Sequence, residues 1–147
     1  MGDRVECELH LHGAIARDRL PMLAAALEDG DPFWRDGETA DYLARGGGVI
    51  VFPEMNYGEM PADLTAALTA LGLAWAWRSG AGAGFPASVE FHDASGADAS
   101  FIVSEYEILL TISEARDVER RAEAARWQAF WRETGALTIT DSNTEGR

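Results

Sequence analysis

The sequence has no lysine, a single cysteine and no long run of apolar residues. All 12 basic residues of this 147-residue chain are arginines, and the lack of lysine excludes a phosphate-binding P-loop, which needs one. The only cysteine, Cys7, excludes an internal disulfide and is typical of a reducing cytoplasm. No apolar run approaches the ~20 residues that a membrane-spanning helix needs. We therefore expect a cytoplasmic protein without a membrane partner.

Acidic side chains are in large excess and unevenly placed. The chain has 25 Asp and Glu against 12 Arg, which gives a formal net charge of −13. Residues 1–114 hold 19 acids and six arginines, whereas residues 115–147 hold six of each. The acidic part repels nucleic acids and anionic membranes. It favours a basic partner or serves solubility alone.

The length and composition indicate one globular domain. Of the 147 residues, 47% are hydrophobic, which suits a packed core rather than a disordered chain. Alternating apolar and polar residues predict strands, and apolar residues three and four apart predict helices. Strands are expected at residues 4–12, 49–52, 73–77 and 88–93, with short additions at 101–103 and 137–140. The predicted class is α+β: a two-layer sheet with helices on one face, in the order β-α-β-α-β-β followed by C-terminal helices.

Local signals set the expected boundaries. Gly13 should end the first strand, Asp18 should cap a helix, and Pro53 should stop a central strand. Ser104 and Glu107 have the spacing of a capping box, which predicts a helix that runs to about Thr134. We assign residues 1–113 to an α+β domain, 114–134 to an amphipathic helix of the same domain, and 135–147 to a short tail.

Three histidines suggest a metal site as an alternative. His10 and His12 lie two apart on one predicted strand, and His92 lies on the polar side of another. Three imidazoles from neighbouring strands could supply three nitrogen ligands to zinc, and the chain would then be a metal-dependent enzyme or a metal-binding protein. The other interpretation is that polar residues simply occupy the exposed side of the sheet.

No other motif indicates chemistry. The acids between Asp29 and Glu38 resemble a calcium loop, but Phe33 and Trp34 stand where an EF-hand needs a ligand and a glycine. Cys7 lies on the apolar side of its strand and is expected to be a buried thiol. We therefore predict no catalytic residue and no cofactor, so the chain is more simply explained as a binding protein than as an enzyme.

A dense acidic segment is the first candidate for partner binding. Residues 28–63 contain nine acids and two arginines. Acids at a helix N-terminus also stabilise the helix dipole, so part of this density has a structural explanation. The candidate partner-binding residues in and beside this segment are Asp36, Glu38, Asp41, Glu54, Tyr57, Glu59 and Asp63.

An aromatic face on the last helix is the second candidate. Trp127, Phe130 and Trp131 are spaced three and four apart, so they share one side of the helix. Packing of this side on the domain core is the preferred interpretation. If the side is exposed instead, it could join two copies into a homodimer or a larger assembly, or bind a partner.

One part of the chain resembles a known group of proteins. The motif Glu54-Met55-Asn56-Tyr57-Gly58-Glu59 is followed by a leucine-bearing helix, a Trp-rich strand and a Gly-rich connection. Over residues 49–110 this pattern is similar to small uncharacterised acidic proteins of phages and plasmids. The resemblance implies an origin in a mobile element and no catalytic residues.

These observations predict a non-enzymatic acidic binding protein. Its carboxylates would occupy a basic surface of a host nucleic-acid-handling complex and inhibit it, as proteins of the anti-CRISPR or anti-restriction kind do. A three-histidine metal protein and a self-assembling protein joined through the tryptophan helix are the alternatives.

Overall fold

The computed structural model describes residues 4–30, 32 and 38–141 as an α+β fold, which confirms the predicted class. Within these residues, the strands are β1 (Arg4–Ala16), β2 (Val49–Asn56), β3 (Ala74–Ser79), β4 (Ser88–His92), β5 (Asp98–Ser104), β6 (Glu107–Leu109) and β7 (Ala136–Thr140). The helices are η1 (Arg17–Arg19), α1 (Leu20–Asp29), α2 (Glu38–Ala44), α3 (Ala62–Ala70), α4 (Ile112–Arg116) and α5 (Val118–Glu133).

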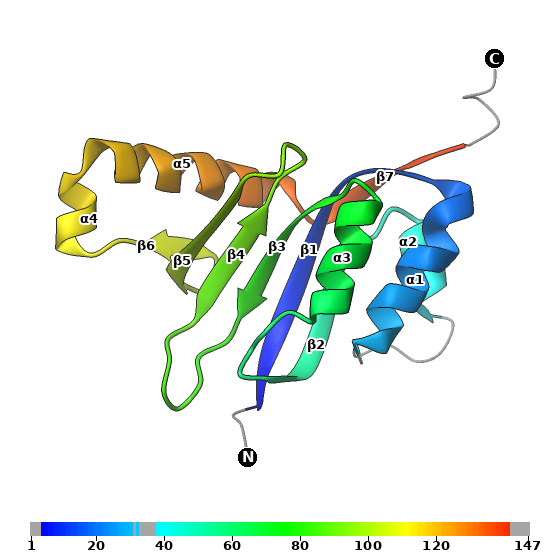
Figure 1. The fold of residues 1–147 in the computed structure, drawn as a ribbon, viewed down its shortest axis with the longest axis horizontal. Helices are drawn as coiled ribbons and strands as arrows, with labels where there is room; N and C mark the ends of the chain where they lie inside the picture. Colours follow the sequence, from blue (N-terminus) through cyan, green and yellow to red (C-terminus); the bar gives the residue numbers. More distant parts are fainter. Residues whose placement is uncertain (1–3, 31, 33–37, 142–147) are drawn as a thin grey trace.

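The strands form one open sheet in the order β2-β1-β3-β4-β5-β6 (Figure 1). Neighbours along this order are antiparallel, and β7 pairs in parallel with the far end of β1. Strand β1 has the predicted alternation, with Val5, Cys7, Leu9 and Leu11 buried. These four side chains point to one face of the sheet, because successive residues of a strand point to opposite faces.

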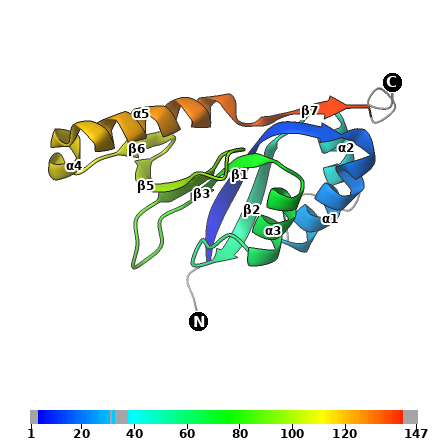
Figure 2. The ribbon, with the colours of Figure 1, turned by 45° about the horizontal axis from the view of Figure 1, so that its top comes forward.

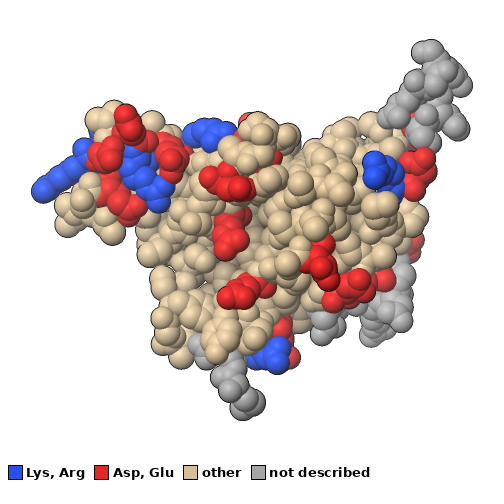
Figure 3. Space-filling model, in the orientation of Figure 1, with Lys and Arg blue, Asp and Glu red and all other residues tan. Residues whose placement is uncertain are grey.

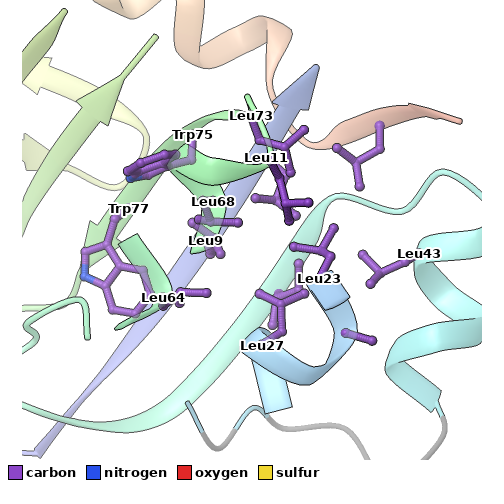
Figure 4. Close-up of a cluster of buried hydrophobic side chains, with 14 of the residues drawn as sticks. Leu9, Leu11, Leu23, Leu27, Leu43, Leu64, Leu68, Leu73, Trp75 and Trp77 are labelled. Carbon is purple, nitrogen blue, oxygen red and sulfur yellow. The ribbon is translucent and has the colours of Figure 1, made fainter. Parts of the chain in front are cut away.

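Helices α1, α2 and α3 cover that face over β2, β1 and β3, and we name it the α3 face. Leucines of the three helices pack against leucines of β1 and against Trp77, all of which are buried (Figure 4). Trp77 also donates an indole hydrogen bond of 2.8 Å to the carbonyl of Gly58. This is the larger of two hydrophobic clusters in the described residues.

Helix α5 lies on the opposite face, which we name the α5 face, and packs over β3, β4 and β5 (Figure 2). Phe91 stacks on Trp127 with ring centroids 5.2 Å apart. The expectation that all helices share one face is therefore wrong for α5. The two helical layers are displaced along the sheet, so each face has one covered part and one open part.

The first strand is longer than predicted. Gly13 does not end β1 but continues it with a φ of 127°, and the strand runs to Ala16. Its extension pairs with β7, from His12 opposite Ala136 to Ala16 opposite Thr140. The expected pairing of residues 137–140 is therefore confirmed, and this part of the predicted tail belongs to the sheet.

Strand β2 also passes the predicted stop at Pro53, because β2 is an edge strand rather than a central one. A proline has no N–H group to donate to a neighbouring strand. A central strand has hydrogen-bonded neighbours on both sides and therefore excludes proline, whereas an edge strand tolerates it on its open side. Asp18 lies in η1 instead of capping a helix, and α1 begins at Leu20 without a side-chain cap.

The predicted capping box at Ser104 is wrong. Ser104 and Glu107 face each other across a two-residue turn that joins β5 to β6, and Glu105 in this turn has a φ of 53°. The helical region begins later, where Thr111 and Glu114 form the capping box of α4. None of the helices among the described residues is long and apolar enough to span a membrane.

Candidate functional site

The described acidic candidates are all exposed, but they do not form one cluster. Glu38 and Asp41 lie on α2, Glu54 lies near the end of β2, and Asp63 lies in the first turn of α3. Helix α1 packs against both α2 and α3 and separates their acids (Figure 1). Glu59 is exposed in the loop before α3. Asp36 lies outside the described residues.

Tyr57 has a structural setting of its own. Its side chain is 52% exposed, and its backbone has a φ of 56°, followed by Gly58 with a φ of 68°. The Gly58 carbonyl accepts the indole hydrogen bond of Trp77 and lies 3.6 Å from the sulfur of Cys7. The turn that presents Tyr57 is thus attached directly to the core.

The three histidines do not converge. His10 pairs with Ala76 and then Phe91 across the sheet, whereas His92 pairs with Trp75 and then Leu11. Because residues directly opposite each other share a face, His10 and His12 lie on the α5 face and His92 lies on the α3 face. No group of three or more potential metal ligands is found among the described residues. The predicted three-histidine metal site is therefore incorrect.

The tryptophan helix packs on the domain. Trp127 and Trp131 are 2% and 4% exposed, and Phe130 is partly buried against the same cluster. This burial agrees with the preferred interpretation of the aromatic spacing. It leaves no tryptophan face on α5 through which two copies could join.

The open part of the α3 face forms a hollow beside α3. This α3–β5 hollow has a volume of about 440 Å³ and is lined by Met60, Thr65, Trp75, Glu90, Phe91, His92, Asp98, Ala99 and Ser100. The imidazole of His92 stacks on Trp75 at a centroid distance of 4.3 Å, and its Nδ1 lies 2.6 Å from Oδ1 of Asp98. These contacts hold the histidine in a defined orientation.

This histidine–aspartate pair has no nucleophilic partner among the described residues. There, His92 makes no hydrogen bond to a serine, threonine or cysteine. Cys7 is buried on the same face at the centre of the core, and desolvation raises its pKa to about 11. The thiolate that nucleophilic catalysis requires is therefore strongly disfavoured.

A second hollow lies on the other side of α3. This α1–α3 hollow has a volume of about 320 Å³ and is lined by Met22, Ala26, Asp29, Gly30, Pro61, Asp63, Leu64 and Ala67. Among the described acidic candidates from the sequence, only Asp63 lines either of the two hollows. Glu90 and Asp98 of the first hollow were not predicted, because their approach to α3 depends on the sheet order.

The open part of the α5 face holds a polar cluster that the sequence also did not indicate. The hydroxyl of Tyr106 donates to the Glu8 carboxylate at 2.8 Å, and Nε2 of His10 lies 3.0 Å from Oε1 of Glu8. Burial, and after it the hydrogen bond to Glu8, raises the pKa of Tyr106, so its phenol stays neutral. A helix predicted at residue 104 would have carried Tyr106 away from β1.

Comparison of the chain with protein-family models, with curated proteins and with solved structures finds no match.

Proposed function

We propose that this chain is a non-enzymatic acidic binding protein that inhibits a nucleic-acid-handling complex by presenting carboxylates to a basic surface. The observation that carries the proposal is the lining of the two hollows beside α3. Together they contain Asp29, Asp63, Glu90 and Asp98, and no arginine is among their described lining residues.

The distribution of charge over the surface supports this choice of face. Acidic side chains lie across the middle of the α3 face, and arginines lie near its margins (Figure 3). The exposed ridge of α3 between two acidic hollows has the form of a surface that fits a groove lined by basic side chains. Carboxylates that face such a groove attract it over long distances and gain most at low ionic strength.

The net charge of −13 argues against direct binding of nucleic acid, since phosphates would be repelled. Arginine and lysine clefts that normally hold phosphates attract carboxylates for the same electrostatic reason. A protein of this charge would therefore compete with nucleic acid for its binding site. An anti-CRISPR or anti-restriction inhibitor acts in this way.

Charge reversal at the two hollows tests the proposal. Asp29→Arg and Glu90→Arg each place a positive charge in one hollow, and neither residue lies at a helix N-terminus. Asp29 is the last residue of α1, where a positive charge is favourable to the helix dipole. Loss of binding by Asp29→Arg then reflects the interface rather than the stability of α1.

Glu133→Arg at the end of α5 is the matched control, because it changes the net charge equally at the far end of another helix. Each variant is immobilised and offered host lysate at low and high salt, and the captured complex is then assayed for binding of its nucleic acid. We expect capture and inhibition by the wild type and Glu133→Arg at low salt, and neither by the two hollow variants. Equal capture by all four proteins, or capture that persists at high salt, contradicts the proposal.

The same assay decides the role of the acids first indicated by the sequence. Charge reversal at Glu54 and Glu59, which line neither hollow, should weaken capture if the surface extends beyond the hollows to β2 and the loop before α3. Unchanged capture would restrict the binding surface to the two hollows.

A further inference from the structure

Three aromatic rings meet on the open part of the α5 face. The ring centroids of His10 and Tyr106 are 6.0 Å apart, those of His10 and Trp131 are 6.4 Å apart, and those of Tyr106 and Trp131 are 5.8 Å apart. The interplanar angles are 55°, 72° and 65° in the same order. The three rings are therefore steeply inclined to one another, as the walls of a corner are.

A pocket of about 190 Å³ opens on these rings, and we name it the aromatic pocket. It is lined by His10, Tyr106, Gln128, Trp131 and Arg132. One water occupies roughly 30 Å³ in the liquid, so the pocket has room for a group of several heavy atoms. Its walls are mostly ring surfaces, which carry a negative electrostatic potential on their faces.

Hydrogen bonds hold the rings in place. The Glu8 carboxylate forms hydrogen bonds with both His10 and Tyr106. Nε2 of Gln128 donates a hydrogen bond of 2.9 Å to the backbone carbonyl of Tyr106. Trp131 is 4% exposed and belongs to the core under α5. The rings are thus fixed before any ligand arrives, which reduces the entropic cost of binding.

One carboxylate beside the pocket favours a cation, and two arginines lie nearby. Glu8 contacts two of the rings, and its side chain is 15% exposed, so its negative charge is only partly screened by water. The guanidinium carbon of Arg78 lies 5.2 Å from the centroid of Tyr106, so this ring already attracts a cation of the protein itself. Arg132 is an exposed lining residue that opposes a second cation.

From this geometry we propose that the aromatic pocket binds an alkylammonium group, such as a trimethylammonium. Inclined aromatic rings recognise methylated ammonium ions through cation–π attraction. Methyl groups weaken the hydration of the cation, so a methylated cation leaves water more readily than an unmethylated one. The pocket lies on the opposite face of the sheet from the two acidic hollows, so this proposal does not depend on the proposed function.

The first experiment is a titration of the wild-type protein with choline, in which nuclear magnetic resonance records the indole N–H signals. The Trp131 signal, identified by its loss in Trp131→Phe, should move and saturate. The Trp77 signal is an internal control, because its indole bonds to Gly58 on the other face. The neutral isostere of choline, with carbon in place of the quaternary nitrogen, should bind at least about tenfold more weakly. Equal binding of the isostere, or no movement of the Trp131 signal up to about 10 mM choline, overturns the proposal.

Two substitutions at Tyr106 separate the ring from its hydroxyl. Tyr106→Phe keeps the aromatic face and should retain choline binding within about threefold, whereas Tyr106→Leu removes the face and should weaken binding about tenfold or more. Arg132→Gln removes the opposing charge and should tighten binding. Binding unchanged in Tyr106→Leu, or weakened in Arg132→Gln, contradicts a cation site.

Two probes distinguish the sources of the group. Choline represents a free small molecule, and a short peptide with trimethyllysine represents a modified partner protein. Tighter binding of the peptide than of choline assigns the pocket to a protein side chain, and the reverse assigns it to a small molecule.

Discussion

Replacing Gly58 by alanine should destabilise the fold far more than the same change at Gly72. Both glycines have positive φ, 68° and 72°, so alanine at either position meets a left-handed backbone that costs about 1–2 kcal/mol. At Gly58, however, an added Cβ would lie 1.9 Å from Oγ of Ser79 and 2.9 Å from a methyl group of Val5. At Gly72 no atom lies within 4 Å.

The steric contact should add a further 1–3 kcal/mol, roughly, at Gly58, as overpacking of a core does. We therefore expect Gly58→Ala to lower the free energy of unfolding by about 2–5 kcal/mol and Gly72→Ala by about 1–2 kcal/mol. Urea denaturation followed by tryptophan fluorescence measures both, with similar m-values if the folded state is otherwise unchanged.

Ser79→Gly supplies the control, because it removes the atoms that the new methyl group would meet. In a double-mutant cycle, the cost of Gly58→Ala should fall by at least about 1 kcal/mol in the Ser79→Gly background. Equal costs at Gly58 and Gly72, or no coupling with Ser79, would refute the packing of the Tyr57–Gly58 turn on β3.

Two further predictions concern stability. Trp127→Ala should cost about 3–5 kcal/mol because Trp127 is 2% exposed, whereas Val118→Ala on the same helix, at a residue that is 68% exposed, should change the stability by less than about 0.5 kcal/mol; similar thermal shifts for both would contradict the burial of the tryptophan side. The pKa of Asp93 is lowered, first by the hydrogen bond from the Ser95 hydroxyl and further by backbone N–H groups of Ala97 and Ser95. Because the pKa is lower in the folded state, the ionised carboxylate stabilises the fold at pH values above its unfolded-state pKa of about 3.9. This contribution to stability is lost as the pH falls further. Asp93→Ala should therefore have a lower free energy of unfolding than the wild type at pH near 7. Urea denaturation should show that this difference becomes smaller below about pH 3.9. A difference that does not depend on pH would show that the carboxylate charge is not involved.

The periodic patterns of apolar residues in the sequence predicted individual strands and helices well, but they could not predict the order of the strands in the sheet. The alternation around Leu9 and the aromatic spacing of α5 both arise from burial on one side of a single element, which a sequence displays directly. Which strands are neighbours depends on contacts between distant segments. For this reason the separation of His92 from His10 and the approach of Glu90 to α3 were not accessible.

The errors at Ser104 and Pro53 have a different origin. Ser104 and Glu107 have the side chains of a capping box. However, Ser104 ends β5 and Glu107 begins β6, and the pairing of these two strands in a hairpin overrides the preference for a helix. Pro53 is compatible with a strand because β2 has an open edge. The capping-box spacing and the proline are each compatible with two local structures. Only the arrangement of the sheet decides whether a helix or a hairpin forms at Ser104, and whether the strand ends or continues at Pro53.

The pairing of β7 with β1 has a consequence for the order in which the chain folds. Arg17 forms an ion pair with Asp141, 124 residues further along the chain, and the N–H of Gly135 bonds to the carbonyl of Leu11. The far half of β1 therefore cannot complete its pairing until a segment 124 residues further along the chain has been synthesised. Such long sequence separations slow the search for native pairs, because loop closure must precede the gain from the contact. Until then the extended end of β1 exposes unpaired backbone groups, which leaves this segment of the newly made chain open to incorrect pairing.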